Sequence, residues 1–314
     1  MNSGDVSYDH VERTPYQVGQ KSVNYRSNIL SDLEMIEELP SLPQSVFVIE
    51  EVAMDPDSSA ADLAEVVGHD PAFAARLLKV ANSSYYLGAS DQEIASIQAA
   101  VARLGFVEVR RMCLSVGIMR SFIRPSKAVN HRAFWEHSLT AAAGARAIAA
   151  ECSAKASVDA DTAFVAGLLH EVGSLVLDQF FPHEYAEVHQ QLSGKRTGIH
   201  QLERSLLETD HAEVGAYLLQ RWNLPMELVQ TVRYHHRPAD APAEFQSLAQ
   251  VVHLADFIAT RFGVAGPGEG NLWQLDTDAW DRLGFDLDKI RRLRQQIVEE
   301  GERSHAFVRA SLTA

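Results

Sequence analysis

Residues 70–81 read DPAFAARLLKVA, and this stretch carries a complete helix signature. Asp70 offers a side-chain oxygen for an N-cap, and Pro71 occupies the first helical position, where its missing N–H costs no hydrogen bond. The apolar residues that follow recur at helical spacing, and they are Ala74, Leu77, Leu78 and Ala81. The stretch therefore predicts an amphipathic α-helix that begins at a defined residue and buries one face.

The same signature recurs on both sides of this stretch. Ser59 and Asp62 form a capping signal for a helix over 59–67, Ser96 caps an apolar run, and Asn130 precedes an alanine-rich run to about Cys152. Further helices are predicted at 184–193, 198–208, 211–222, 226–236, 245–262 and 287–312. Period-two runs rich in Val, Ile and Thr are essentially absent, so the sequence predicts an all-α fold.

The composition is that of a globular protein. The 314 residues carry 28 Lys and Arg against 42 Asp and Glu, a formal charge of −14, which disfavours a nonspecific nucleic-acid binder. Cys113 and Cys152 are the only cysteines, too few for a disulfide framework, and we expect both to be reduced. No uncharged apolar stretch reaches the roughly 18 residues of a membrane span. We therefore expect a cytoplasmic protein that does not contact a membrane.

Changes in sequence pattern divide the chain into segments. Residues 1–25 show no helical or strand periodicity and predict a mobile tail. A boundary at Arg124-Pro125-Ser126 separates two predicted helical bundles, at 26–126 and 127–262. Residues 263–314 are expected to form a linker followed by C-terminal helices. The parts of this last segment are a glycine-rich loop from Gly263 to Asn271, a short helix from Trp280 to Leu283 and a long helix from Leu287 to Leu312.

Imidazole and carboxylate groups gather in the second half of the chain. Together they are the ligand set for a divalent transition metal such as Mn, Fe or Zn. Asp256 falls in the apolar run Val251 to Ile258, where a buried carboxylate needs a cation or hydrogen-bond donors to offset its desolvation. Gly215 lies one turn from a histidine and lets another group approach closely. The candidate metal ligands are His137, His170, Glu171, His211, His235, His236 and Asp256.

A purely structural histidine cluster explains the same residues. A histidine on an apolar helix face is usually a hydrogen-bonded core residue, and His253, which shares a face with Asp256, is expected to bond to nearby backbone or side chains. His235 and His236 point about 100° apart on a helix, so we expect at most one of them to face a single metal. We expect five further histidines to be ordinary core residues, namely His131, His183, His189, His200 and His305. On the residues alone, both interpretations stay open.

Two sets of motifs occur in one order along the chain. The C-terminal set is FWEHS (134–138), AGLLHEVG (166–173), DHAEVG (210–215), YHHRP (234–238) and HLAD (253–256). The N-terminal set is LPSLPQ (39–44), DPA (70–72), RLLKVANS (76–83) and AAVARLG (99–105). Together these motifs resemble the HDOD family, the HD-related output domains of bacterial signalling proteins. The resemblance covers about Leu33 to Phe262.

The resemblance implies an N-terminal helical bundle (26–126) packed on an HD-like bundle (127–262), both parts of one HDOD domain. By similarity to HD phosphohydrolases, His137, His170, Glu171 and Asp256 would occupy the positions that hold a catalytic metal. By similarity to HD-GYP phosphodiesterases, His211, His235 and His236 would complete a second metal site.

The chain departs from the enzyme pattern at three places. Glu171 stands where active HD enzymes have aspartate, and the extra methylene moves the carboxylate by about an ångström in a site intolerant of such shifts. Ser174 stands where HD-GYP sequences usually have a lysine that could contact a phosphate. The Gly-Tyr-Pro signature is missing, because His236 is followed by Arg237-Pro238.

These departures favour a non-catalytic signal-transduction module that acts by binding a protein partner or a small ligand. The alternative is a metal-dependent HD-type phosphohydrolase that acts on a nucleotide or cyclic dinucleotide. If the cluster of histidines and carboxylates is a metal site, the expected cofactor under both hypotheses is a divalent transition metal. The signalling partner is unidentified, nucleic acid is not expected, and the C-terminal helices, with Trp273, Trp280, Leu283 and Phe285, are candidates for self-association.

Overall fold

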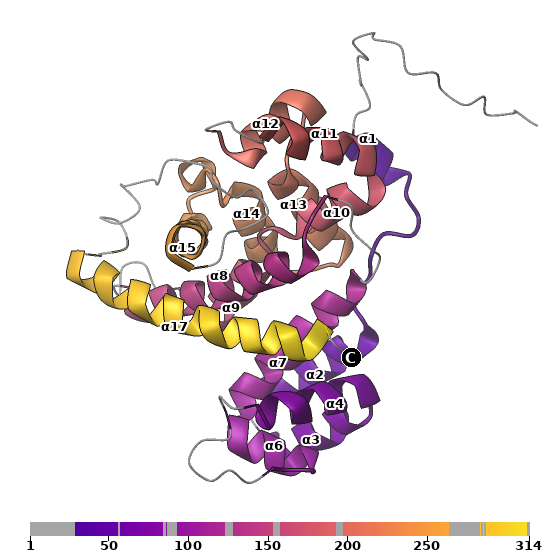
Figure 1. Cartoon of the computed structure of the whole chain (residues 1–314), viewed down its shortest axis with the longest axis vertical. Helices are drawn as coiled ribbons and strands as arrows, with labels where there is room; N and C mark the ends of the chain where they lie inside the picture. Colours follow the sequence, from indigo (N-terminus) through magenta and orange to yellow (C-terminus); the bar gives the residue numbers. More distant parts are fainter. Residues whose placement is uncertain are drawn as a thin grey trace, which may run out of the picture.

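The structure is a computed structural model, and Figure 1 shows its arrangement of helices. It describes residues 29–55, 57–83, 86, 93–122, 128–152, 158–192, 197–263, 283, 285 and 287–312. Within these ranges every regular element is helical, which confirms the all-α fold. The predicted tail at 1–25, most of the predicted loop from Gly263 to Asn271, and Trp273 and Trp280 lie outside the described residues.

The N-terminal bundle lies at the bottom of Figure 1. Its α4 begins as the sequence predicts, because the Asp70 carboxylate accepts a hydrogen bond from the Phe73 amide at 3.3 Å. Gly105 joins two of the helices at a φ of 87°, in the left-handed region that favours glycine. The helices are α2 (Gln44–Met54), α3 (Ala60–Gly68), α4 (Pro71–Ala81), α6 (Ile97–Leu104) and α7 (Phe106–Ser121), and α1 (Ile29–Glu34) precedes them.

The second bundle carries all the candidate ligands. At its centre α8 packs against α9 and α15, while α10 packs against α13. Its first helices are α8 (His131–Glu151), α9 (Ala160–Leu169), α10 (Val172–Phe180), α11 (Pro182–Leu192) and α12 (Ile199–Leu207). They are followed by α13 (His211–Arg221), α14 (Met226–Tyr234), the short 3₁₀ helix η3 (Pro238–Asp240), α15 (Gln246–Ile258) and the π-helix η4 (Ala259–Gly263).

One segment of this bundle is apolar enough to resemble a membrane span. It covers Ala160–Phe180, with a mean hydropathy of 1.3, and 78% of it is buried inside the protein. The segment is also interrupted, because α9 ends at Leu169 and α10 begins at Val172. Its apolar character is therefore accounted for by the protein core, where it places His170 and Glu171 at the junction of two helices.

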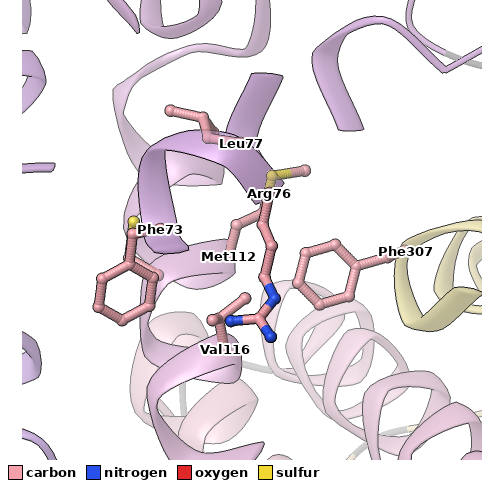
Figure 2. A pocket seen from close by; sticks show the side chains of 7 residues that line it. Phe73, Arg76, Leu77, Met112, Val116 and Phe307 are labelled. Atoms are coloured by element: carbon pink, nitrogen blue, oxygen red, sulfur yellow. The ribbon is translucent and has the colours of Figure 1, made fainter. Parts of the chain in front are cut away.

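The C-terminal helix α17 (Leu287–Leu312) crosses both bundles, as the yellow helix in Figure 1 shows. It packs on α8 and η4 of the second bundle and on α4 of the N-terminal bundle. Near its end, Phe307 lines a pocket together with residues of α4 and α7, among them Arg76 and Met112 (Figure 2). The predicted helix at 287–312 is thus confirmed. Its residues Leu293, Ile297 and Val308, and the preceding Leu283 and Phe285, are buried within the chain.

Candidate metal centre

The first part of the centre joins α8 to α15. Asn130 caps α8 through the Ala133 amide, and two turns into this helix His137 is 1% exposed. The Nε2 atom of His137 lies 3.1 Å from Oδ1 of Asp256 on α15. The same carboxylate oxygen accepts a hydrogen bond from the Thr260 hydroxyl at 3.2 Å. Asp256 therefore has the donors that a buried carboxylate requires.

The helix junction between α9 and α10 supplies the next two groups. Close packing brings it to α8, because a Cβ at Gly167 would lie 2.8 Å from the Cα of Ala142. Nδ1 of His170 donates a hydrogen bond to the Gly167 carbonyl at 2.7 Å, so its Nε2 is directed into the centre. That Nε2 atom lies 3.6 Å from Oδ1 of Asp256 and 3.9 Å from Oε1 of Glu171.

A glycine contact brings α13 to the same place. A Cβ at Gly173 would collide with the carbonyl oxygen of His211 and would lie 2.6 Å from the amide nitrogen of Gly215. The close approach expected at Gly215 is thus the neighbouring helix α10. The contact between α10 and α13 brings His211 close to Glu171. The distance from Nε2 of His211 to Oε1 of Glu171 is 3.5 Å.

The prediction that at most one of His235 and His236 faces a single metal is wrong. His235 is the C-cap of α14 and keeps helical dihedrals (φ −60°, ψ −25°), yet its ring lies beside that of His236, with ring centroids 3.9 Å apart. One donor atom from each histidine lies within 4.8 Å of donors from Glu171 and His211. The His235 ring is anchored by its Nδ1, 2.7 Å from the Val232 carbonyl.

Burial and charge set the protonation of the centre. Burial lowers the pKa of His235 and His236 well below 6.5, so both imidazoles are neutral and offer a lone pair. Burial would raise the pKa of Asp256, but the neighbouring imidazoles of His137 and His170 outweigh it and hold that pKa well below 3.8.

His211 is the exception among the imidazoles. Burial favours its neutral form, but the carboxylates of Glu171 and Glu203 together outweigh burial and raise its pKa to about 10. A carboxylate thus faces each of its two nitrogens: Glu203 lies against Nδ1 and Glu171 near Nε2.

The donor set fits a divalent transition metal. Two groups of ligand atoms occur, each spanning at most 4.8 Å: His137, His170 and Glu171 form one, and Glu171, His211, His235 and His236 form the other. The buried Nε2 atoms of His170 and His235 have no hydrogen-bond partner. Such orphaned acceptors are rare in protein interiors, and a cation would satisfy them. These two groups contain six of the seven predicted residues. The seventh, Asp256, lies beside the first group, where its Oδ1 atom is 3.1 Å from Nε2 of His137.

Sequence reasoning missed one residue at the centre. Glu203 on α12 is fully buried, and its carboxylate lies 2.6 Å from Nδ1 of His211. A signal for it exists, because Glu203 sits midway between Ile199 and Leu207 on an otherwise apolar helix face. His200, interpreted as an ordinary core residue, stacks on His236 with ring centroids 4.1 Å apart.

Two other expectations, on His253 and Ser174, can be compared with the structure. His253 bonds to backbone as predicted, with Nδ1 2.7 Å from the His235 carbonyl. Ser174 stands at the position where the sequence comparison expects a lysine in HD-GYP enzymes. The Ser174 hydroxyl donates a hydrogen bond to Oε2 of Glu171 at 3.1 Å. The side chain of His305 lies outside the described residues.

Comparisons with known proteins agree with this architecture. A protein of Treponema pallidum (strain Nichols), uncharacterised in function, is 28% identical over 223 residues, which are 71% of this chain and 42% of that protein. This chain thus spans less than half the length of that relative. The crystal structure of an HDOD domain protein of unknown function from Geobacter sulfurreducens has a TM-score of 0.75 and 26% identity, over 88% of this chain and 96% of that one.

A second crystal structure is equally similar. It belongs to a Marinobacter aquaeolei VT8 protein named as a candidate signal transduction protein, with a TM-score of 0.76 and 25% identity, over 91% of this chain and 65% of that one. The profile of the HDOD domain family matches residues 39–238, which is more than half of the 314 residues. The resemblance found in the sequence is confirmed: this chain belongs to the HDOD domain family.

Proposed function

We propose that this protein is a non-catalytic signal-transduction module that binds a protein partner or small ligand, and that its second bundle holds a divalent transition metal as part of its regulatory state. The observation that carries the proposal is the closure of the donor cluster. His170, His211 and His235 are each 0% exposed, and Asp256 is 2% exposed. Such a cluster can hold an ion, but it offers little room for a substrate and water to reach the ion together.

Charge around the cluster supports the same conclusion. In the described residues, the ion-pair partners of Glu171 and Asp256 are all imidazoles. Arg237, which follows the histidine pair, lies 3.9 Å from Glu213 instead. Phosphoryl transfer normally relies on cations that neutralise the phosphate oxygens. Neither Ser174 nor Arg237 supplies one at the cluster.

One observation favours the alternative, a metal-dependent phosphohydrolase acting on a nucleotide or cyclic dinucleotide. Glu171 belongs to both groups of donor atoms, so one carboxylate joins them. It is 5% exposed, and His236 beside it is only partly buried. A metal bound there would polarise a water or phosphate oxygen. This edge is where a substrate would have to enter.

Metal content and hydrolysis separate the two functions. The experiment uses full-length protein without a histidine tag, purified without chelator, and compares wild type with the His170→Ala/Asp256→Ala double variant by elemental mass spectrometry. Asp240→Asn, a change at an exposed carboxylate on η3, is the matched control. Hydrolysis of nucleotides and cyclic dinucleotides is measured on the same samples, loaded with Mn, Fe or Zn.

The proposal expects near-stoichiometric metal in wild type and Asp240→Asn, loss of metal in the folded double variant, and no hydrolysis. Turnover that disappears with the metal would establish the phosphohydrolase instead. A folded wild type that stays empty after incubation with all three metals would overturn the metal site and leave a structural histidine cluster.

A further inference from the structure

The side chain of Glu203 connects three parts of the second bundle. Its Oε2 atom accepts a hydrogen bond from the backbone amide of His211 at 2.9 Å and lies 2.6 Å from Nδ1 of the same residue. Its Oε1 atom accepts a hydrogen bond from the Tyr185 hydroxyl at 3.0 Å. Glu203, His211 and Tyr185 are all 0% exposed. A carboxylate is therefore held in the core with three donors directed at it.

This arrangement decides which nitrogen of His211 is available. A carboxylate only accepts hydrogen bonds at neutral pH, so Nδ1 of His211 carries a proton directed at Glu203. The opposite nitrogen, Nε2, then faces the donor cluster, 3.5 Å from Glu171 and 2.8 Å from Nε2 of His236. An ion at the cluster would take the place of a proton on Nε2, while the proton on Nδ1 stays with Glu203.

The backbone contact adds a second constraint. His211 is the first residue of α13, where an amide has no partner within the helix. Glu203 satisfies that amide and the ring of the same residue with one oxygen, so the ring and the start of the helix are oriented together. Tyr185, from α11, donates to the other oxygen, which does not contact His211. Loss of the carboxylate would therefore free both the imidazole rotamer and its tautomer.

We propose that Glu203 is a positioning residue for metal binding, which holds His211 in the tautomer and orientation that present Nε2 to the ion. The proposal rests on the metal site proposed above. Carboxylates behind a ligating histidine typically change metal affinity 10- to 100-fold when they are replaced. Glu203 does not itself reach the ion, and its effect passes through His211.

The test measures Zn²⁺ affinity by competition with a chromophoric chelator, and the visible spectrum of the Co²⁺-loaded protein, for wild type and Glu203→Gln. Two further variants separate positioning from stability. Tyr185→Phe removes a donor from Oε1 but leaves the contact with His211. Glu213→Gln changes a carboxylate two residues after His211 on α13, which bonds to Thr209 instead. Urea unfolding of each metal-free variant gives its stability.

The proposal expects Glu203→Gln to weaken Zn²⁺ binding by about 10-fold or more and to alter the Co²⁺ spectrum. Tyr185→Phe should lower stability but keep affinity within about twofold, and Glu213→Gln should leave affinity unchanged. Wild-type affinity in Glu203→Gln would overturn the positioning role while the metal site stands. A wild type that binds no metal at all would overturn both.

A measurement on wild type alone keeps the test decisive if Glu203→Gln does not fold. Nitrogen-15 NMR of the His211 ring in the Zn²⁺-loaded protein reports which nitrogen is protonated. The proposal expects a proton on Nδ1 and metal on Nε2. Metal on Nδ1, or an unprotonated Nδ1, would overturn it.

Discussion

The imidazole of His137 on α8 lies 3.1 Å from the carboxylate of Asp256 on α15, and both side chains are almost completely buried. Asp256 lies beyond residues 39–238, the part of the chain that matches the HDOD family profile. The centre is therefore completed by a helix outside the matched region. His170 is the second imidazole near the same carboxylate, at 3.6 Å.

Replacing His137 by alanine should expose the energetic role of this pair. Removing one partner of a buried pair leaves an uncompensated charge, so we expect His137→Ala to lower the free energy of unfolding of the metal-free protein by about 3 kcal/mol. Adding Asp256→Asn removes that charge and should recover part of the loss. Urea unfolding of both single variants and the double variant measures the coupling. Additive effects would show that the two side chains do not interact.

Gly173→Ala should disrupt the contact between α10 and α13. The added Cβ meets the carbonyl of His211, which cannot move aside as a flexible side chain can. We expect a loss of about 3 kcal/mol in the free energy of unfolding, at the upper end of overpacking costs. Gly68→Ala is the matched control, because its Cβ would meet nothing within 4 Å and alanine favours a helix by up to about 1 kcal/mol. Equal stability of the two variants would contradict the glycine contact.

Phe307→Ala tests whether α17 holds the two bundles together. The buried ring lines a pocket together with residues of α4 and α7 (Figure 2), and its loss should cost about 3 kcal/mol of unfolding free energy. Arg291→Ala, at a side chain that is 77% exposed on the same helix, should change stability by less than about 0.5 kcal/mol. Hydrogen exchange should also become faster in α17 of Phe307→Ala. Unchanged exchange there would show that the ring does not anchor the helix.

Cys152 should react slowly with alkylating reagents. Burial disfavours its charged thiolate and raises the pKa of the thiol to about 11, and the thiolate is the reactive form. At pH 7.5 we expect iodoacetamide to react roughly 300-fold more slowly than with a free cysteine of pKa about 8.5, in proportion to the fraction of thiolate. The rate should rise about tenfold for each pH unit up to about pH 10. Mass spectrometry of the alkylated protein measures the reaction rate, with Cys152→Ser as the control. A rate that levels off near pH 9 would contradict the raised pKa.

The sequence alone was sufficient for the helical elements and for the choice of candidate ligands. Capping signals are local, because an N-cap side chain bonds to an amide two or three residues away. The signals at Ser59, Ser96 and Asn130 were therefore confirmed as caps without knowledge of the fold. Burial of Asp256 also followed from its apolar neighbours in one helix. The division of the chain into segments stays a prediction, as does self-association through the C-terminal helices.

Only the tertiary structure decided how these residues meet. His235 and His236 face one cluster because the end of α14 lies beside Glu171 and His211, and Glu203 bonds to His211 because α12 packs beside α13. Helix periodicity describes one helix at a time and carries no information about which faces come together. Those contacts depend on close approaches such as Gly173 to His211, between residues far apart in the sequence. The sequence by itself thus determined the helices and the donor groups, whereas packing between helices decided that these groups form a single buried centre.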